Sequence, residues 1–98
     1  MAKYLVLWEI DSTKIPVSPQ ERAAMWGPMA DMVRQDMKKG ISKDWGIFVG
    51  EVNGYAIAEG TEVEVSNMIQ QYVPFVHFEV HHVMSVEQAD EVTKALTK

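Results

Sequence analysis

The sequence lacks cysteine and is poor in basic residues, with nine lysines and arginines against fourteen aspartates and glutamates. Without cysteine the chain can form neither a disulfide nor a thiolate metal site, which fits a reducing compartment. The formal net charge of −5 disfavours nucleic acid and anionic membranes as partners, because both are bound through basic patches. We therefore expect no nucleic-acid partner and no membrane partner.

Long apolar runs and cofactor motifs are also missing. Near the N-terminus the longest apolar run extends from Tyr4 to Trp8, too short for a signal-peptide core or a membrane span. There is no glycine-rich phosphate loop, nucleophile elbow, zinc-binding helix motif or flavin or nicotinamide fingerprint. These absences predict a cytoplasmic protein that uses no cofactor, and the length of 98 residues predicts one domain, residues 1–98.

Hydrophobic periodicity predicts four strands and three helices. Residues 3–10, 43–50, 55–59 and 74–84 are short runs rich in branched and aromatic residues, which favours strands. Between them, a helix from Ser18 to about Lys39 has a buried stripe at spacings of three and four. That stripe consists of Trp26, Met29, Ala30, Val33 and Met37.

Local signals predict where these elements begin, bend and end. Serine or threonine followed three residues later by glutamate or glutamine predicts helix starts at Ser18, Thr61 and Ser85. Pro28 removes a hydrogen bond inside the first helix, so we expect a kink or break there. Asn53-Gly54 is typical of a two-residue hairpin turn between the second and third strands.

The element order β-α-β-β-α-β with a terminal helix predicts an α+β, ferredoxin-like domain. Right-handed crossovers fold this order into a four-stranded antiparallel sheet with two helices on one face. The other face would expose an apolar patch of Leu5, Leu7, Phe75 and Val83. A second copy placed face to face would cover this patch, so we expect a homodimer.

At this point the chain resembles the dimeric α+β barrel superfamily, and within it a small family of uncharacterised proteins. The resemblance rests on four segments and the glutamate-containing terminal helix that follows them: Tyr4-Leu5-Val6-Leu7-Trp8-Glu9-Ile10, Lys43-Asp44-Trp45-Gly46, Gly54-Tyr55-Ala56-Ile57-Ala58-Glu59 and Phe78-Glu79-Val80. The superfamily includes muconolactone isomerase and quinol-type monooxygenases. The resemblance implies a barrel cavity between or beside facing sheets. It supplies no catalytic motif that can be carried over to this chain.

The fourth strand carries the candidate site. His77, Glu79 and His81 alternate along it and point away from the face of Val76 and Phe78. We expect them to line one cavity, with Glu79 hydrogen-bonded to a histidine. Neighbours on one strand face lie about 6.6 Å apart and the two histidines about 13 Å apart, too far for one metal ion to bridge. Glu79 with either histidine could share a metal only with a third ligand from elsewhere.

Three further residues join the predicted ligand-binding set: Glu9 and Phe75 at strand ends, and Trp45, which is either a lid over the cavity or core. The main hypothesis is a homodimer that binds a small, partly apolar organic molecule on the open sheet face, as a cofactor-free isomerase or oxygenase relative. One alternative is a non-catalytic dimer with a structural His-Glu-His column. The other is a metal-binding module.

Overall fold

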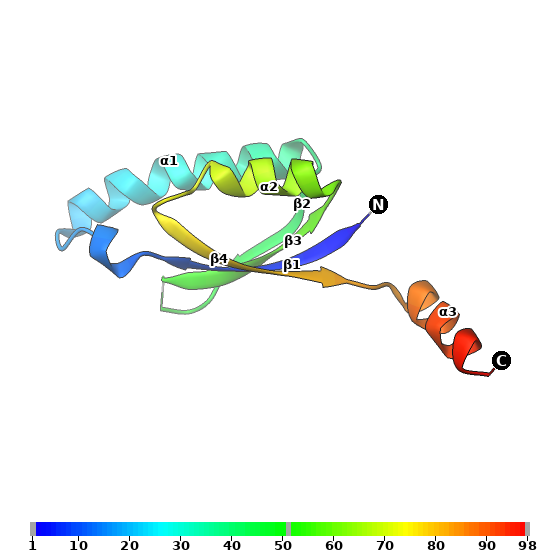
Figure 1. The fold of residues 1–98 in the computed structure, drawn as a ribbon. Helices are drawn as coiled ribbons and strands as arrows, with labels where there is room; N and C mark the ends of the chain where they lie inside the picture. The colour runs from blue at the N-terminus through cyan, green and yellow to red at the C-terminus, as the bar shows by residue number, and fades with distance from the viewer. Residues whose placement is uncertain (1, 51, 98) are drawn as a thin grey trace.

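Seven predicted elements and one short 3-10 helix follow one another along the chain (Figure 1). The structure is a computed structural model, and it describes residues 2–50 and 52–97. The bounds are β1 Lys3–Ile10, η1 Ser12–Lys14, α1 Pro19–Lys38, β2 Ser42–Ile47, β3 Asn53–Glu59, α2 Glu62–Gln70, β4 Val76–Val83 and α3 Val86–Leu96.

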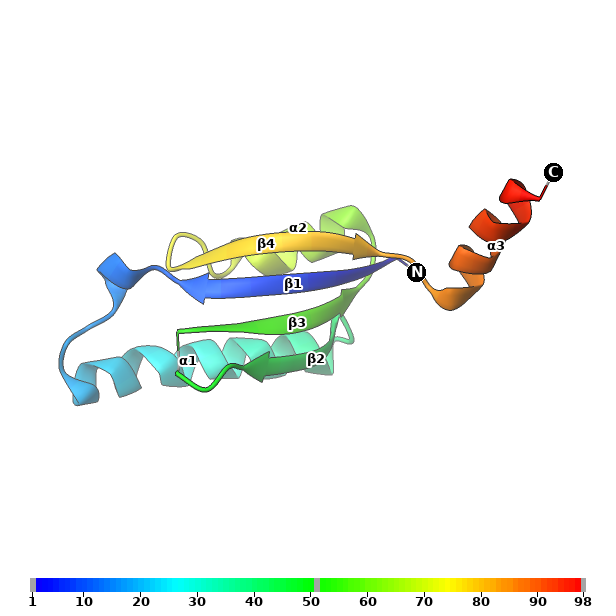
Figure 2. The same cartoon turned by 90° about the horizontal axis from the view of Figure 1, so that it is seen from below.

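The four strands form one antiparallel sheet in the order β2-β3-β1-β4. Helices α1 and α2 both lie over one face of this sheet, as Figure 1 shows, while Figure 2 looks onto the opposite face, which neither of them covers. Each helix connects two strands that have a third strand between them, which is the crossover of the ferredoxin-like fold. The predicted ferredoxin-like architecture is thus confirmed.

The core lies between the sheet and the two helices. Burial alternates residue by residue along β1 and β3, as period-two strands require when one face is covered. The helix-facing side of β3 carries Ala56 and Ala58, whose small side chains leave space for larger neighbours. The buried hydrophobic residues are Tyr4, Val6, Trp8, Ile10, Ala56, Ala58, Val65, Met68, Tyr72 and Val76.

The predicted helix starts are confirmed by their capping hydrogen bonds. Ser18 Oγ accepts from the Glu21 N–H, and Thr61 and Ser85 open complete capping boxes. In the Thr61 box, hydrogen bonds from the backbone and side chain of Thr61 lower the pKa of Glu64. These bonds satisfy N–H groups that the first helical turn leaves without an internal partner.

Of the kink or break predicted at Pro28, the break is wrong, because α1 continues through this residue from Pro19 to Lys38, while the kink stays a prediction. Proline cannot donate to the carbonyl of Ala24, one turn earlier. Both residues lie on the exposed side of α1, so water can satisfy that carbonyl. The loss of one bond is tolerated in a helix of 20 residues that packs along its opposite side.

The hairpin turn predicted at Asn53-Gly54 is also misplaced, since both residues belong to β3. The chain turns between Ile47 and Asn53, so β2 ends three residues earlier than predicted. Gly50 has a φ of 127°, a value that side-chain-bearing residues in strands do not adopt. Gly54 lies opposite Trp8 instead, where a Cβ atom would overlap the indole ring.

The buried stripe of α1 differs from the prediction at its C-terminal end. Met37 is 44% exposed, whereas Asp36, one residue earlier, is 4% exposed. Asp36 lies three residues after Val33, so it fits the helical period equally well. A carboxylate therefore occupies the position that the sequence analysis gave to a methionine.

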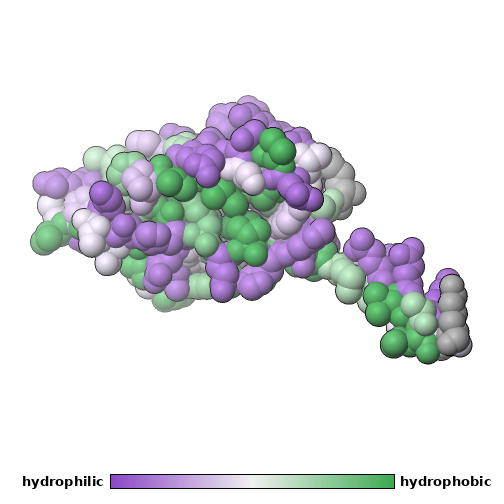
Figure 3. Space-filling model, in the orientation of Figure 1, coloured by the Kyte–Doolittle hydropathy of each residue, from purple (hydrophilic) through white to green (hydrophobic). Residues whose placement is uncertain are grey.

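Helix α3 extends away from the rest of the molecule, beyond the end of β4 (Figures 1 and 2). Its apolar residues lie exposed, with Val86 at 69%, Val92 at 50% and Leu96 at 80%. Figure 3 shows hydrophobic residues of this helix on the molecular surface. Over residues 2–50 and 52–97, no helix is both long enough and apolar enough to cross a bilayer.

The contact between Trp8 and Gly54 predicts a sharp difference between two glycine substitutions. We expect Gly54→Ala to lower the free energy of unfolding by about 1–3 kcal/mol, because the added methyl overpacks the indole and the Gly46 carbonyl. The control is Gly27→Ala, in the exposed part of α1, where a Cβ meets no neighbour. This change should raise the free energy of unfolding by about 0.5–1 kcal/mol. Urea denaturation measures both, and equal effects of the two substitutions would contradict the packing argument.

Candidate functional site

The predicted polar column lies on the face of the sheet that α1 and α2 leave uncovered. In the register of β4 with β1, His77 is opposite Glu9, Glu79 is opposite Leu7 and His81 is opposite Leu5. All three column residues are exposed in the single chain. Enclosing them would require a second molecule, so the cavity expected around them stays a prediction.

The column divides into two separate pairs. His81 Nε2 lies 3.4 Å from Glu79 Oε2, and His77 Nε2 lies 3.3 Å from Asp11 Oδ2. Asp11 was not among the predicted residues, although it directly follows the strand that pairs with β4. Two hydrogen bonds from Thr13 lower the pKa of Asp11, and His77 contributes in the same direction.

A metal site does not form from these residues alone. Among the residues that the structure describes, no three histidine, aspartate or glutamate side chains are grouped closely enough to hold an ion. The strand spacing explains this result for the column. His77 and His81 each lie two residues from Glu79 on the same face of β4, so the two histidines are too far apart to bind one ion.

A shallow groove on the uncovered face brings three of the predicted residues together. Glu9, His77 and Glu79 line it with Asn53 and the exposed ring of Phe48, while His81 lies further along β4. The groove is open to solvent, and its ionisable groups are exposed. It therefore becomes an enclosed site only if another surface covers it.

The remaining two predicted residues lie elsewhere. Phe75 belongs to the turn before β4 and is 46% exposed. Trp45 projects from β2 toward the helices, on the opposite face of the sheet from the polar column, where its ring stacks on Trp8. The two ring centroids are 5.4 Å apart and the planes differ by 10°. Of the two roles considered for Trp45, packing in the interior is the one that its position supports.

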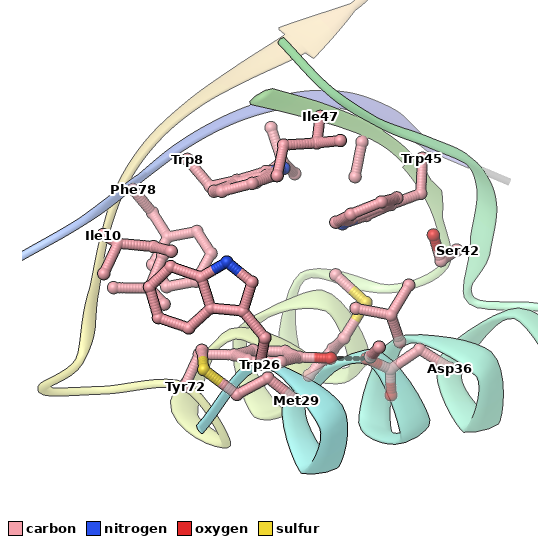
Figure 4. Close-up of a pocket in the computed structure, with 16 residues that line it drawn as sticks. Trp8, Ile10, Trp26, Met29, Asp36, Ser42, Trp45, Ile47, Tyr72 and Phe78 are labelled. Carbon is pink, nitrogen blue, oxygen red and sulfur yellow. Dashed lines mark hydrogen bonds between the residues drawn. The ribbon is translucent and has the colours of Figure 1, made fainter. Parts of the chain in front are cut away.

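Trp45 instead lines a second, more enclosed space between the sheet and the helices, which we call the tryptophan cavity (Figure 4). Its volume is about 150 Å³. All three tryptophans of the chain contribute to it. It is lined by Val6, Trp8, Ile10, Trp26, Met29, Ala30, Val33, Asp36, Ser42, Trp45, Ile47, Ala56, Met68, Tyr72, Val76 and Phe78.

The walls of the tryptophan cavity are apolar except at one end. Figure 4 shows Trp8 and Trp45 on the sheet side and Asp36 and Tyr72 on the helix side. Ile47, the last residue of β2, lines the cavity and is nevertheless 44% exposed. The cavity therefore reaches solvent at the C-terminal end of β2. The space is thus both accessible and largely apolar, as small-molecule sites are.

The polar end is organised around the buried Asp36 carboxylate. Its Oδ2 accepts a hydrogen bond from the Tyr72 hydroxyl, and its Oδ1 accepts one of 3.0 Å from Gln71 Nε2. Burial, together with the hydrogen bond to Asp36, raises the pKa of Tyr72, so this hydroxyl stays protonated and donates. The arrangement presents a fixed acceptor group to an otherwise apolar space.

Sequence reasoning missed the tryptophan cavity, although a signal was present. Trp26 and Val33 were placed on the buried stripe of α1, and Asp36 continues that stripe at a spacing of three. A charged residue on a buried stripe indicates either a partner or a function. Its partner Tyr72 lies in the turn that follows α2, a distant part of the sequence.

The contacts of Asp11 with Thr13 and His77 predict how the pKa of Asp11 responds to substitution. Thr13→Val removes the hydroxyl that donates to Asp11 Oδ1 at 2.6 Å, so the pKa of Asp11 should rise toward its ordinary value. His77→Gln should raise it by a smaller amount, because His77 contributes less to the lowering. Carboxyl carbon NMR titration measures both changes, with the exposed Asp31 of α1 as an internal reference. A larger change for His77→Gln would show that the histidine dominates.

Comparisons with protein-family models and with curated proteins found no match to this chain. Its function is therefore inferred from the residues of the two sites.

Proposed function

We propose that this protein binds a small, largely apolar organic molecule in the tryptophan cavity. The observation that carries the proposal is a solvent-accessible space of about 150 Å³ with three tryptophans in its walls and a buried carboxylate, Asp36, at one end. The sequence predicted a ligand of this kind but placed it on the open sheet face. The tryptophan cavity supports the same ligand class at a different location.

The size and lining of the cavity set limits on the ligand. A largely apolar cavity of about 150 Å³ is large enough for a benzene-sized molecule. Transfer of each methylene-sized group from water into such a space contributes about 0.8 kcal/mol to binding. A ligand that also donates a hydrogen bond to Asp36 would be oriented, since the aromatic walls alone give little direction.

Asp36 is also the group through which this cavity could perform acid–base chemistry. Its carboxylate can accept a proton from a ligand held against the indole rings, which is the step that a cofactor-free isomerase requires. The observation in favour is that Tyr72 and Gln71 hold the carboxylate in one orientation before a ligand enters, while each oxygen keeps a further lone pair for a ligand proton. A catalytic role for His77, Glu79 and His81 stays a separate prediction.

Ligand binding is tested by blocking the cavity. Toluene, phenol, benzylamine and tetramethylammonium, titrated separately, should perturb tryptophan fluorescence and amide NMR signals around the cavity for at least one compound. Ala30→Phe should weaken that binding by about tenfold or more, because Ala30 lines the cavity and the added ring occupies it. The control is Ala23→Phe on the exposed side of the same helix. Binding by none of the four compounds, or equal effects of the two variants, would refute the proposal.

We also propose that the protein assembles as a homodimer through the uncovered sheet face. Leu5, Leu7, Tyr55 and Ile57 form a partly exposed apolar band across the middle of this face. Phe48, 45% exposed, stacks against Tyr55 at the edge of the band. A second copy would cover the band and enclose the polar column, and it would also offer a surface for the exposed apolar residues of α3.

The proposed dimer predicts that a charged residue placed in the apolar band will prevent assembly. Light scattering should give a dimer mass at micromolar concentration, because facing sheets would bury at least the roughly 1,000 Å² of a biological interface. Leu7→Asp should shift the mass to that of a monomer, since it places a charge in the middle of the contact. Val63→Asp, at an exposed position of α2, should leave the dimer intact. A monomer mass for the unsubstituted protein would contradict this assembly.

A further inference from the structure

The charge of the tryptophan cavity narrows the ligand class further. Resting on the proposal that this cavity binds a small molecule, we infer that its ligand is a small organic cation, a protonated or methylated amine. The positive group would lie between Asp36 and the indole rings of Trp8 and Trp45, which Figure 4 shows on opposite sides of the cavity. Three features of the structure support a cation over a neutral molecule.

The first feature is a buried negative charge with no opposite charge beside it. Asp36 is 4% exposed, and within residues 2–50 and 52–97 no lysine, arginine or histidine nitrogen lies within 4.0 Å of its carboxylate. Its two partners, Tyr72 and Gln71, are neutral donors. A buried carboxylate is costly unless it is paired, so a cationic ligand would supply the missing counter-charge.

The second feature is the position of Asp36 in α1. It lies in the last turn of Pro19–Lys38, at the end of the helix where the aligned peptide dipoles give a partial negative charge. A carboxylate is unfavourable there, and the effect adds to the negative potential at this end of the cavity. Lys38 and Lys39 follow at exposed positions, so their ammonium groups remain in water.

The third feature is the pair of parallel indole rings on the sheet side. The ring planes of Trp8 and Trp45 differ by 10°. The Trp8 ring is held in place by the hydrogen bond of 3.2 Å that its Nε1–H donates to the Tyr55 carbonyl. Indole is the aromatic group that attracts cations most strongly through its face, especially where water is excluded. The aromatic wall and the carboxylate therefore favour the same charge on the ligand.

The test compares two probes of the same shape that differ in charge. Choline carries a trimethylammonium group, and 3,3-dimethyl-1-butanol carries the neutral tert-butyl group in its place. By calorimetry and tryptophan fluorescence on the whole chain, choline should bind about tenfold or more tightly than the neutral alcohol. Asp36→Asn should remove most of this preference, and Trp45→Leu should reduce it while leaving the carboxylate in place. Asp31→Asn, which removes an exposed carboxylate on the same helix, should leave the preference unchanged.

Each outcome bears on a different claim. If the neutral alcohol binds as tightly as choline, the cation inference is wrong, while binding of a small apolar molecule stands. If neither probe binds and the four-compound panel also fails, both proposals are wrong. If Asp36→Asn does not fold, the choline-to-alcohol ratio of the unsubstituted protein and the ratio of Trp45→Leu still decide the matter.

Discussion

The structure depends on β1, which is hydrogen-bonded on both sides, to β3 and to β4, and therefore cannot rotate about its axis. Its period-two alternation sends Tyr4, Val6, Trp8 and Ile10 to the helices and Leu5, Leu7 and Glu9 to the opposite face. A shift of one residue would exchange these two sets. Both candidate sites follow from the register of β1 with its two neighbours. The groove lies on one face of β1 and the tryptophan cavity on the other.

Trp8 shows how the register of β1 leads to the tryptophan cavity. Its ring lies over Gly54 on the neighbouring strand, donates to the Tyr55 carbonyl and stacks on Trp45 from β2. The small side chain of Ala56 on β3 leaves the space between these large rings and the helices unfilled. The tryptophan cavity is thus a consequence of combining large and small side chains on one sheet face, with Asp36 as its polar end.

Much of the fold could be predicted because its signals are local. The alternation along residues 3–10, the capping motifs at Thr61 and Ser85 and the order of elements all depend on neighbours within a few positions, and the structure confirms them. The errors came from local signals that tertiary contacts override. Pro28 lies on the solvent side of a long packed helix, and Gly54 serves the packing of Trp8 rather than a turn.

By itself the sequence determined that His77, Glu79 and His81 share one face of a strand, because side-chain direction along a strand follows from position alone. It could not determine that His77 pairs with Asp11, or that Asp36 meets Tyr72 across 36 residues, because such contacts depend on how the elements pack. The sequence left two roles for Trp45 for the same reason. The direction of its side chain depends on the register of β2 with β3, and an irregularity between Ser42 and Asp44 sets this register. Only the tertiary structure decided that three tryptophans and a carboxylate enclose one space.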